Sequence, residues 1–164
     1  MNKDSVGGIV ACRVSGIPAG LGEPVFGKLD AELARAILSV GAVKGIEFGA
    51  GFSAADSTGS KNNDPMRIAA DGSVRFESNN AGGIIGGISN GADIFFRVAV
   101  KPVPSIFREQ KTISAQGDGS YTDSDFVIEG RHDVCLCPRI VPVIEAMAAI
   151  TLADLLLQNR ASRF

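Results

Sequence analysis

Three ionisable residues, Arg131, His132 and Asp133, stand side by side just before a long apolar stretch. The planar guanidinium group of an arginine can bind a phosphate or carboxylate through two parallel hydrogen bonds. Asp133 could exchange a proton if burial raised its pKa, and His132 could take either role or bond a backbone carbonyl. Taken alone, the segment is better explained as a surface turn. It is the first candidate for chemistry on an anionic ligand.

Two other segments could bring backbone close to a ligand. Residues 78–91, SNNAGGIIGGISNG, contain five glycines, but they match neither the GxGxxG nor the GxxxxGK[ST] fingerprint. A ligand and a neighbouring helix are both possible partners for such a stretch. Residues 101–105, KPVPS, combine one cation with a rigid loop between prolines. This loop suits an anionic or heteroaromatic ligand, although a strand-ending turn with a solvated lysine has the same sequence.

The elements that must position these segments can be read from hydrophobic periodicity. We expect strands at residues 8–14, 42–49 and 93–101, and two shorter ones at 111–115 and 125–130 joined through the turn residues 117–120. Two helices are expected, at residues 24–40 and 138–158. The order favours an α+β fold, with antiparallel sheet laid over helices. The whole chain, residues 1–164, reads as part of one domain.

The first helix has Leu29, Leu33 and Ile37 on its core face, which Phe26, Ala36 and Val40 widen, and Gly41 stands where a C-cap glycine would. The second is apolar on most of its circumference, which predicts a helix in the middle of a protein, with Pro142 in its first turn. Residues 51–72 show no sustained period and predict a mobile loop.

Composition excludes several classes of partner. With 16 basic and 18 acidic residues, the net charge of -2 gives no reason to expect nucleic acid or an anionic membrane. One histidine and three cysteines, Cys12, Cys135 and Cys137, predict no metal site and reduced thiols. The N-terminus resembles no secretion signal, so we expect a cytoplasmic protein.

Taken together, the three segments resemble one family. SNNAGGxxGGISNG, KPxxS with KT a few residues on, and RHDxCxxPRxxPxxEAM occur here in the order found in chorismate synthases. The upstream stretch GIPAGLGEPVFGKLDAELARAILSVGAVKGIEFGAGF and the ending ADLLLQNRA are also similar to that family. The resemblance covers nearly the whole chain apart from residues 53–70.

The resemblance implies a β-α-β sandwich, with helices packed between antiparallel sheets, assembled as a homotetramer. It implies reduced FMN as cofactor, with NADPH as a possible reductant, and 5-enolpyruvylshikimate 3-phosphate as substrate. The implied reaction is a 1,4-anti elimination of phosphate and a ring hydrogen that gives chorismate.

Roles are carried over by motif. The resemblance places flavin contacts on Gly41, Ala42 and Gly86, on the loop Lys101, Pro102, Val103, Pro104 and Ser105, and on Arg131. We expect close backbone approach to explain Gly41 and Gly86. Arg131 would also bind the substrate, and Asp133 is the candidate acid/base residue. His132 belongs to the motif without a catalytic assignment.

Part of the family pattern is absent from this sequence. The family carries a GESHG-type motif with a catalytic histidine and a GRxSARET-type motif with a second histidine and arginines, and neither occurs here. We therefore expect the C-terminal portion of a chorismate synthase, inactive without the N-terminal half that holds those motifs. The alternative is a non-catalytic module of the same fold that serves flavin binding or assembly.

Overall fold

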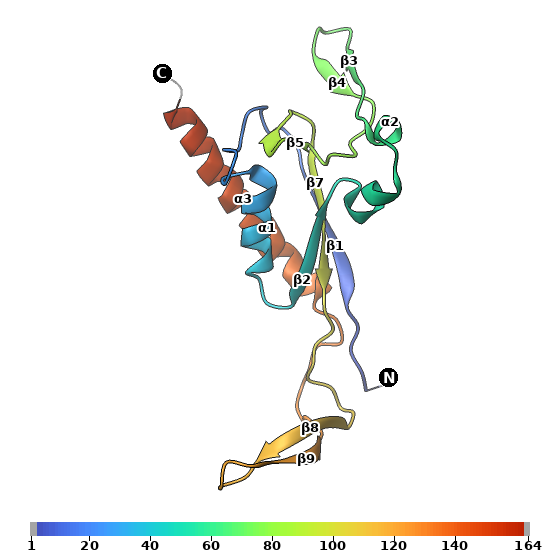
Figure 1. Ribbon diagram of the computed structural model, residues 1–164, viewed down its shortest axis with the longest axis vertical. Coiled ribbons are helices and arrows are strands. Elements are labelled where there is room, and N and C mark those ends of the chain that lie inside the picture. Colours follow the sequence, from blue (N-terminus) through green and yellow to red (C-terminus); the bar gives the residue numbers. More distant parts are fainter. Residues whose placement is uncertain (1–2, 163–164) are drawn as a thin grey trace.

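The computed structural model describes residues 3–162 and contains a three-stranded sheet, two main helices, one very short hairpin and two projecting hairpins (Figure 1). The elements follow in the order β1 (Gly8–Val14), α1 (Leu29–Leu38), β2 (Val43–Phe48), the 3-10 helix η1 (Gly51–Asp56), α2 (Gly59–Asn62), β3 (Met66–Ile68), β4 (Val74–Phe76), β5 (Ile84–Ile85), β6 (Ile88–Ser89), β7 (Ile94–Val100), β8 (Gln110–Ala115), β9 (Tyr121–Phe126) and α3 (Cys137–Ala161).

The central sheet has the order β1-β7-β2, and β7 pairs antiparallel with both neighbours. Gly8 lies opposite Val100 in one pair, and Phe48 lies opposite Phe96 in the other. Along β7, Ile94, Phe96, Val98 and Val100 are buried and the residues between them are not, as the alternation predicts. The three long strands are confirmed to within a residue or two of their expected ends.

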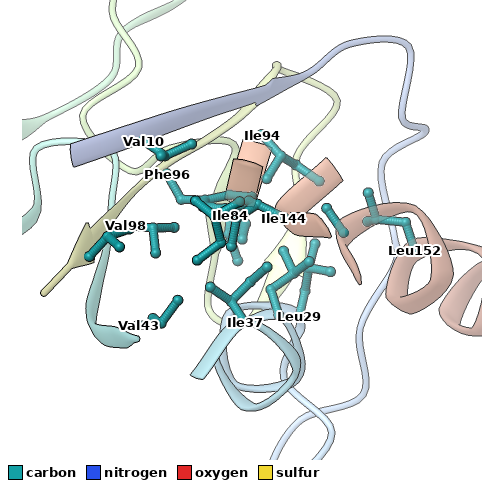
Figure 2. Close-up of a cluster of buried hydrophobic side chains, with 14 of the residues drawn as sticks. Val10, Leu29, Ile37, Val43, Ile84, Ile94, Phe96, Val98, Ile144 and Leu152 are labelled. Carbon is teal, nitrogen blue, oxygen red and sulfur yellow. The ribbon is translucent and has the colours of Figure 1, made fainter. Parts of the chain in front are cut away.

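Both main helices lie on the same face of this sheet and cover its apolar side (Figure 1). Phe96 lies between the sheet and the side chains of Ile37 on α1 and Ile144 on α3 (Figure 2). Each helix supplies a row of buried side chains, namely Leu29, Leu33 and Ile37 from α1 and Ile140, Ile144, Ala148, Leu152 and Leu155 from α3. The α+β class, with helices against antiparallel sheet, is confirmed.

The first helix is shorter than expected. A turn closed by bonds between Glu23 and Gly27 precedes it, and Phe26 in that turn is 92% exposed rather than part of the core face. The helix ends with Ser39 as its C-cap, so Gly41 is not the capping residue. The left-handed backbone that a C-cap glycine would have occurs one residue later, at Ala42, whose φ is 70°.

The last helix buries only one face, which differs from the prediction of a helix surrounded by protein. Val141, Val143, Ile150 and Leu157 on its other side are 43–65% exposed. By length and composition alone α3 could cross a bilayer, since its most apolar window has a mean hydropathy of 2.0 and is 28% buried. A core helix passes the same test, and α3 packs on α1 and β1.

The proline expected in the first turn of α3 lies deeper in the helix. Pro138 is the residue in the first turn, and Pro142 stands inside the helix. The Pro138 ring lacks a donor where none is needed, while Pro142 removes one bond of the helical ladder. Because the helix begins at Cys137, Pro142 is its sixth residue and lies beyond the first turn.

Two segments leave the core as hairpins. Residues 51–72, expected to lack regular structure, form η1, α2 and β3, and β3 pairs with β4. The second hairpin joins β8 and β9, with Lys111 opposite Asp125. Its second strand starts directly after the turn, at Tyr121, so the expected strand at 125–130 was placed too late.

Candidate functional site

The turn of Gly41 and Ala42 and the loop 101–105 meet at the end of the sheet where β2 begins and β7 ends. The backbone N–H of Lys101 donates to the carbonyl oxygen of Ala42 at 2.9 Å. The turn containing Gly41 and Ala42 therefore lies directly beside the first residue of the KPVPS loop. This contact follows from the sheet register, because Val43 lies opposite Val100.

The N-terminal segment joins residues 131–134 to this end of the sheet. Ser5 Oγ donates to the carbonyl of Val103 at 2.6 Å, and the backbone N–H of Val6 donates to the carbonyl of Val134 at 2.8 Å. From the other side, the rings of Phe107 and His132 pack with centroids 5.3 Å apart. The loop 101–105 and the segment 131–134 are thus held next to each other.

This end of the molecule carries two basic side chains that are free of ion pairs within the described residues. Lys101 and Arg131 are both exposed, and neither forms an ion pair among residues 3–162. His132 Nε2 is buried and has no hydrogen-bond partner in that part of the chain. Two unpaired cations and one orphaned ring nitrogen fit a ligand with an anionic group.

Gly130 is required by its backbone conformation. Its φ is +143°, which L side chains rarely adopt, while a Cβ there would lie 3.4 Å from Cε1 and Nε2 of His132, an ordinary contact distance. The chain turns at this glycine directly before Arg131, His132 and Asp133, and Phe107 packs on the His132 ring.

Asp133 forms an ion pair within the chain. Arg139 Nη1 donates to Asp133 Oδ2 at 2.8 Å, and the Asp133 side chain is 34% exposed. Arg139 lies in the first turn of α3, so the helix orients the carboxylate. The carboxylate is placed beside the cationic end of the sheet, but it is not deeply buried in this chain.

Gly86 is not brought to this end. It lies in the tight turn between β5 and β6, and the next residue, Gly87, accepts a hydrogen bond from the N–H of Leu29 at the start of α1. Ala42 follows the other end of that helix, and ten residues of α-helix span about 15 Å. The residues assigned to the flavin therefore fall in two places in this chain.

Close backbone approach within this chain does not explain Gly41 or Gly86. A Cβ added at either would meet nothing within 4 Å. Gly86 is required by its own conformation, since φ is +63° there and +84° at Gly87, values typical of a two-residue hairpin turn. The close contacts lie elsewhere in the stretch, where a Cβ on Gly82 would stand 2.5 Å from the backbone nitrogen of Gly49.

Asp64 is a residue that the sequence analysis missed. Its Oδ1 accepts hydrogen bonds from Ser78 Oγ at 2.6 Å and the N–H of Asn80 at 2.7 Å, and its Oδ2 accepts one from the N–H of Ala81 at 2.8 Å. One carboxylate therefore organises the start of the glycine-rich stretch. No local motif marks it, because its partners are 14–17 residues away.

Comparison with known proteins identifies the family. The family model described as chorismate synthase matches residues 1–157. This chain belongs to the chorismate synthase family. Curated chorismate synthases from Archaeoglobus fulgidus and Lachnoclostridium phytofermentans are 55% and 53% identical to it, over 95% and 99% of the chain. A crystal structure of chorismate synthase superposes with a TM-score of 0.74 at 33% identity, over 95% of this chain.

The match covers less than half of each relative. The chain spans 42% of the length of the Archaeoglobus fulgidus chorismate synthase, 43% of the Lachnoclostridium phytofermentans one and 39% of the crystallised chain. It corresponds to a C-terminal portion of the family. Residues 3–162 contain no group of three or more histidine, cysteine, aspartate or glutamate side chains that could hold a metal ion.

Proposed function

We propose that this chain carries the C-terminal part of a chorismate synthase active site, in a protein that converts 5-enolpyruvylshikimate 3-phosphate to chorismate and phosphate. The observation that supports this most is the meeting of Ala42, the loop 101–105 and the segment 131–133 at one end of the sheet. These are the segments whose motifs resemble the family. The substrate carries a phosphate and carboxylates, and this end offers two exposed cations.

The residues present fit a bound flavin in the following roles. Lys101 and Arg131 would hold its phosphate or polarised ring edge, and the loop through Ser105 would offer backbone donors. Ala42, held by its bond to Lys101, would line the same surface. Reduced FMN, when bound, supplies transient electron density that helps phosphate leave, and NADPH is a possible reductant.

Arg131 and Asp133 would act on the substrate itself. Arg131 would bind an anionic group of the substrate by its fork of donors and keep it in place as the phosphate departs. Asp133 Oδ1, the carboxylate oxygen that Arg139 does not occupy, would hold the proton that the substrate ring loses. The ion pair with Arg139 would keep that carboxylate oriented.

We further propose that the isolated chain is inactive, because the histidines and arginines of the other family motifs are absent from its sequence. The N-terminal portion of the family would complete the site and cover the exposed apolar side of α3. We expect the complete protein to be a cytoplasmic homotetramer.

The test is chorismate formation under anaerobic conditions, with reduced FMN and the phosphorylated substrate. We expect no product from the chain alone, and product when the unmatched N-terminal portion of the Archaeoglobus fulgidus relative is added. Arg131→Ala in the chain should abolish the restored activity. Turnover by the chain alone would contradict the proposed division of the site. A restored complex that binds FMN but makes no product would favour the non-catalytic module.

A further inference from the structure

Two thiols stand at the start of α3 with a single residue between them. Cys135 and Cys137 are both partly exposed, and neither is bonded to another cysteine. The proposed reaction uses neither of them. Cys135 belongs to the motif RHDxCxxPR, whereas Cys137 occupies a position that this motif leaves open. The second thiol is therefore a feature of this chain that the motif does not require.

The backbone of Leu136 brings the two cysteines to disulfide distance. When peptide bonds are planar, the dihedral angles of one residue set the separation of the Cα atoms on either side of it. Leu136 has φ -83° and ψ -16°, in the right-handed helical region. Helix geometry places the Cα atoms of residues i and i+2 about 5.4 Å apart, and disulfides join Cα atoms about 4.4–6.8 Å apart. The pair can therefore be bridged while Leu136 keeps its conformation.

The Cys137 thiol is held in place against β1. A Cβ added at Gly8 would lie 2.7 Å from Cys137 Sγ, so the sulfur fills the space that the glycine leaves open. Burial and the neighbouring Cys135 thiol raise the pKa of Cys137. A raised pKa slows the direct attack of a thiol on an oxidant. Cys137 is thus placed to complete a disulfide with Cys135 rather than to react first.

We infer that Cys135 and Cys137 form an oxidation site, at which a hydroperoxide produces a reversible disulfide within the chain. The Cys135 thiolate attacks the terminal oxygen of the hydroperoxide. The O–O bond breaks, an alcohol or water leaves, and Cys135 becomes a sulfenic acid. The Cys137 thiolate then attacks that sulfur, so that the S–S bond forms and the S–O bond breaks with release of water. The two thiols give two electrons to the peroxide, and their protons leave in the products.

The disulfide should move the backbone before α3. An S–S bond of about 2.05 Å is shorter than any contact between sulfur atoms that are not bonded, so the two atoms must approach each other. Cys137 is the first residue of α3, and its sulfur packs over Gly8. The movement therefore falls on Cys135 and on the irregular backbone that precedes it.

That backbone carries two contacts of the candidate site. The carbonyl of Val134 accepts the N–H of Val6, and Asp133 pairs with Arg139. Oxidation should loosen both contacts and misplace the Asp133 carboxylate. The predicted loss of turnover rests on the proposed function, whereas the formation of the disulfide does not depend on it.

Peptide mass spectrometry after treatment with hydrogen peroxide, followed by alkylation of the unfolded chain, tests the inference. Trypsin releases both thiols in one peptide, residues 132–139, and Cys12 in another, residues 4–13. Peptide 132–139 should lose two hydrogen atoms and resist alkylation, and dithiothreitol should reverse both effects. Cys12 should be alkylated throughout, because burial and the nearby Glu145 carboxylate raise its pKa.

Two substitutions provide matched controls, with circular dichroism to confirm the fold of each variant. Cys137→Ser should abolish the protection from alkylation, because Cys135 has no thiol left to complete the disulfide. Cys12→Ser should behave as the unchanged chain does. The inference is overturned if both thiols of the unchanged chain are still alkylated after peroxide. It is also overturned if Cys135 is oxidised to sulfinic acid beside a free Cys137, or if the disulfide joins two chains.

Hydrogen exchange and turnover test the effect on the candidate site. After oxidation and removal of peroxide, the amide of Val6 should exchange at least about tenfold faster. The oxidised chain, combined with the N-terminal portion of the Archaeoglobus fulgidus relative, should turn over at least about tenfold more slowly until dithiothreitol is added. C137S should be insensitive to peroxide in both measurements. Unchanged exchange and turnover in a chain that carries the disulfide would overturn its effect on the site. If the reduced complex makes no chorismate, the proposed function fails, while the mass and exchange measurements still decide the inference.

Discussion

Asp64 shows how one side chain can organise a distant loop. Burial by itself raises the pKa of Asp64, but hydrogen bonds from Ser78 Oγ and from the N–H groups of Ala81 and Asn80 outweigh that effect. The pKa therefore lies below its ordinary value, because the charged form is the better acceptor. The same bonds connect the excursion between β2 and β4 with the glycine-rich stretch.

We expect Asp64→Asn to loosen this connection. Asparagine replaces one acceptor oxygen by a donor and removes the charge, so amides of residues 78–82 should exchange roughly tenfold faster. Because the folded pKa is depressed, the contribution of the carboxylate is present above the unfolded value of about 3.9 and is lost as the pH falls through the folded one. Hydrogen exchange measured across that range should show the loss in the unchanged chain and no further change in the variant.

Asp71 provides a control for this experiment. It is a fully exposed aspartate in the same excursion, and its pKa is lowered mainly by hydrogen bonds from the hydroxyl and the N–H of Ser73. Asp71→Asn should affect the hairpin turn but leave residues 78–82 protected. Equal exchange rates in the two variants would show that Asp64 does not organise the glycine-rich stretch.

Asp133 is the residue on which the proposed chemistry depends. In the complex restored with the N-terminal portion of a relative, Asp133→Asn should lower turnover by about 10²–10⁴-fold, the range for loss of an acid/base group. FMN affinity, measured by fluorescence titration, should change little. Asp154→Asn, which changes a carboxylate of α3 bonded to Gln158, should leave both unchanged. Full turnover in D133N would remove Asp133 from the reaction.

At the scale of elements, burial decides which sequence patterns can be read. The alternation in β7 is clear because strands lie on both sides of it and one face is covered. In β8 and β9 almost every residue is exposed, so no alternation of buried and exposed residues marks where the second strand begins. The helix α3 was predicted to be surrounded because its sequence is apolar all round, but a pattern does not say which segment covers it.

The site was predictable only in part for a related reason. The motifs identify which segments carry chemistry, and each segment is short and contiguous in sequence. Which of them meet is decided by register and by bonds from elsewhere, such as those of Ser5 and Val6, which no motif contains. The separation of Gly86 from Ala42 follows from the length of α1, and it could not be inferred from glycine content.

Two residues of the first predicted helix should respond very differently to truncation. Leu33→Ala should lower the free energy of unfolding by about 2–5 kcal/mol, because Leu33 is fully buried between α1 and the rest of the core. Phe26→Ala should change it by less than about 0.5 kcal/mol in this chain, since Phe26 is 92% exposed. Urea unfolding followed by circular dichroism measures both values. A loss above 1.5 kcal/mol for F26A would mean that the ring joins the core after all.

At the scale of the whole molecule, two uncovered surfaces lie on opposite sides. The face of the central sheet that points away from the helices carries the paired charges of Arg97 and Glu47. The outer side of α3 is a ridge of aliphatic side chains without such a pair. The relatives are more than twice as long as the chain, which leaves a large segment of each to cover apolar surface. A long aliphatic ridge fits the buried centre of a larger fold.

The ridge on α3 can be tested separately from the core that lies behind it. The double substitution Ile150→Ser and Leu157→Ser changes two side chains that are 65% and 64% exposed. In the isolated chain the cost should be no more than about 1 kcal/mol, mainly from helix propensity, and solubility should rise. The same variant should bind the N-terminal portion of the Archaeoglobus fulgidus relative at least about tenfold more weakly, because two apolar side chains would no longer be buried there.

Leu152→Ser, on the buried face of α3, should instead unfold the chain, since Leu152 is only 5% exposed. Isothermal titration of each folded variant with that portion decides the matter: unchanged affinity of the I150S/L157S chain would place the N-terminal portion on some other surface.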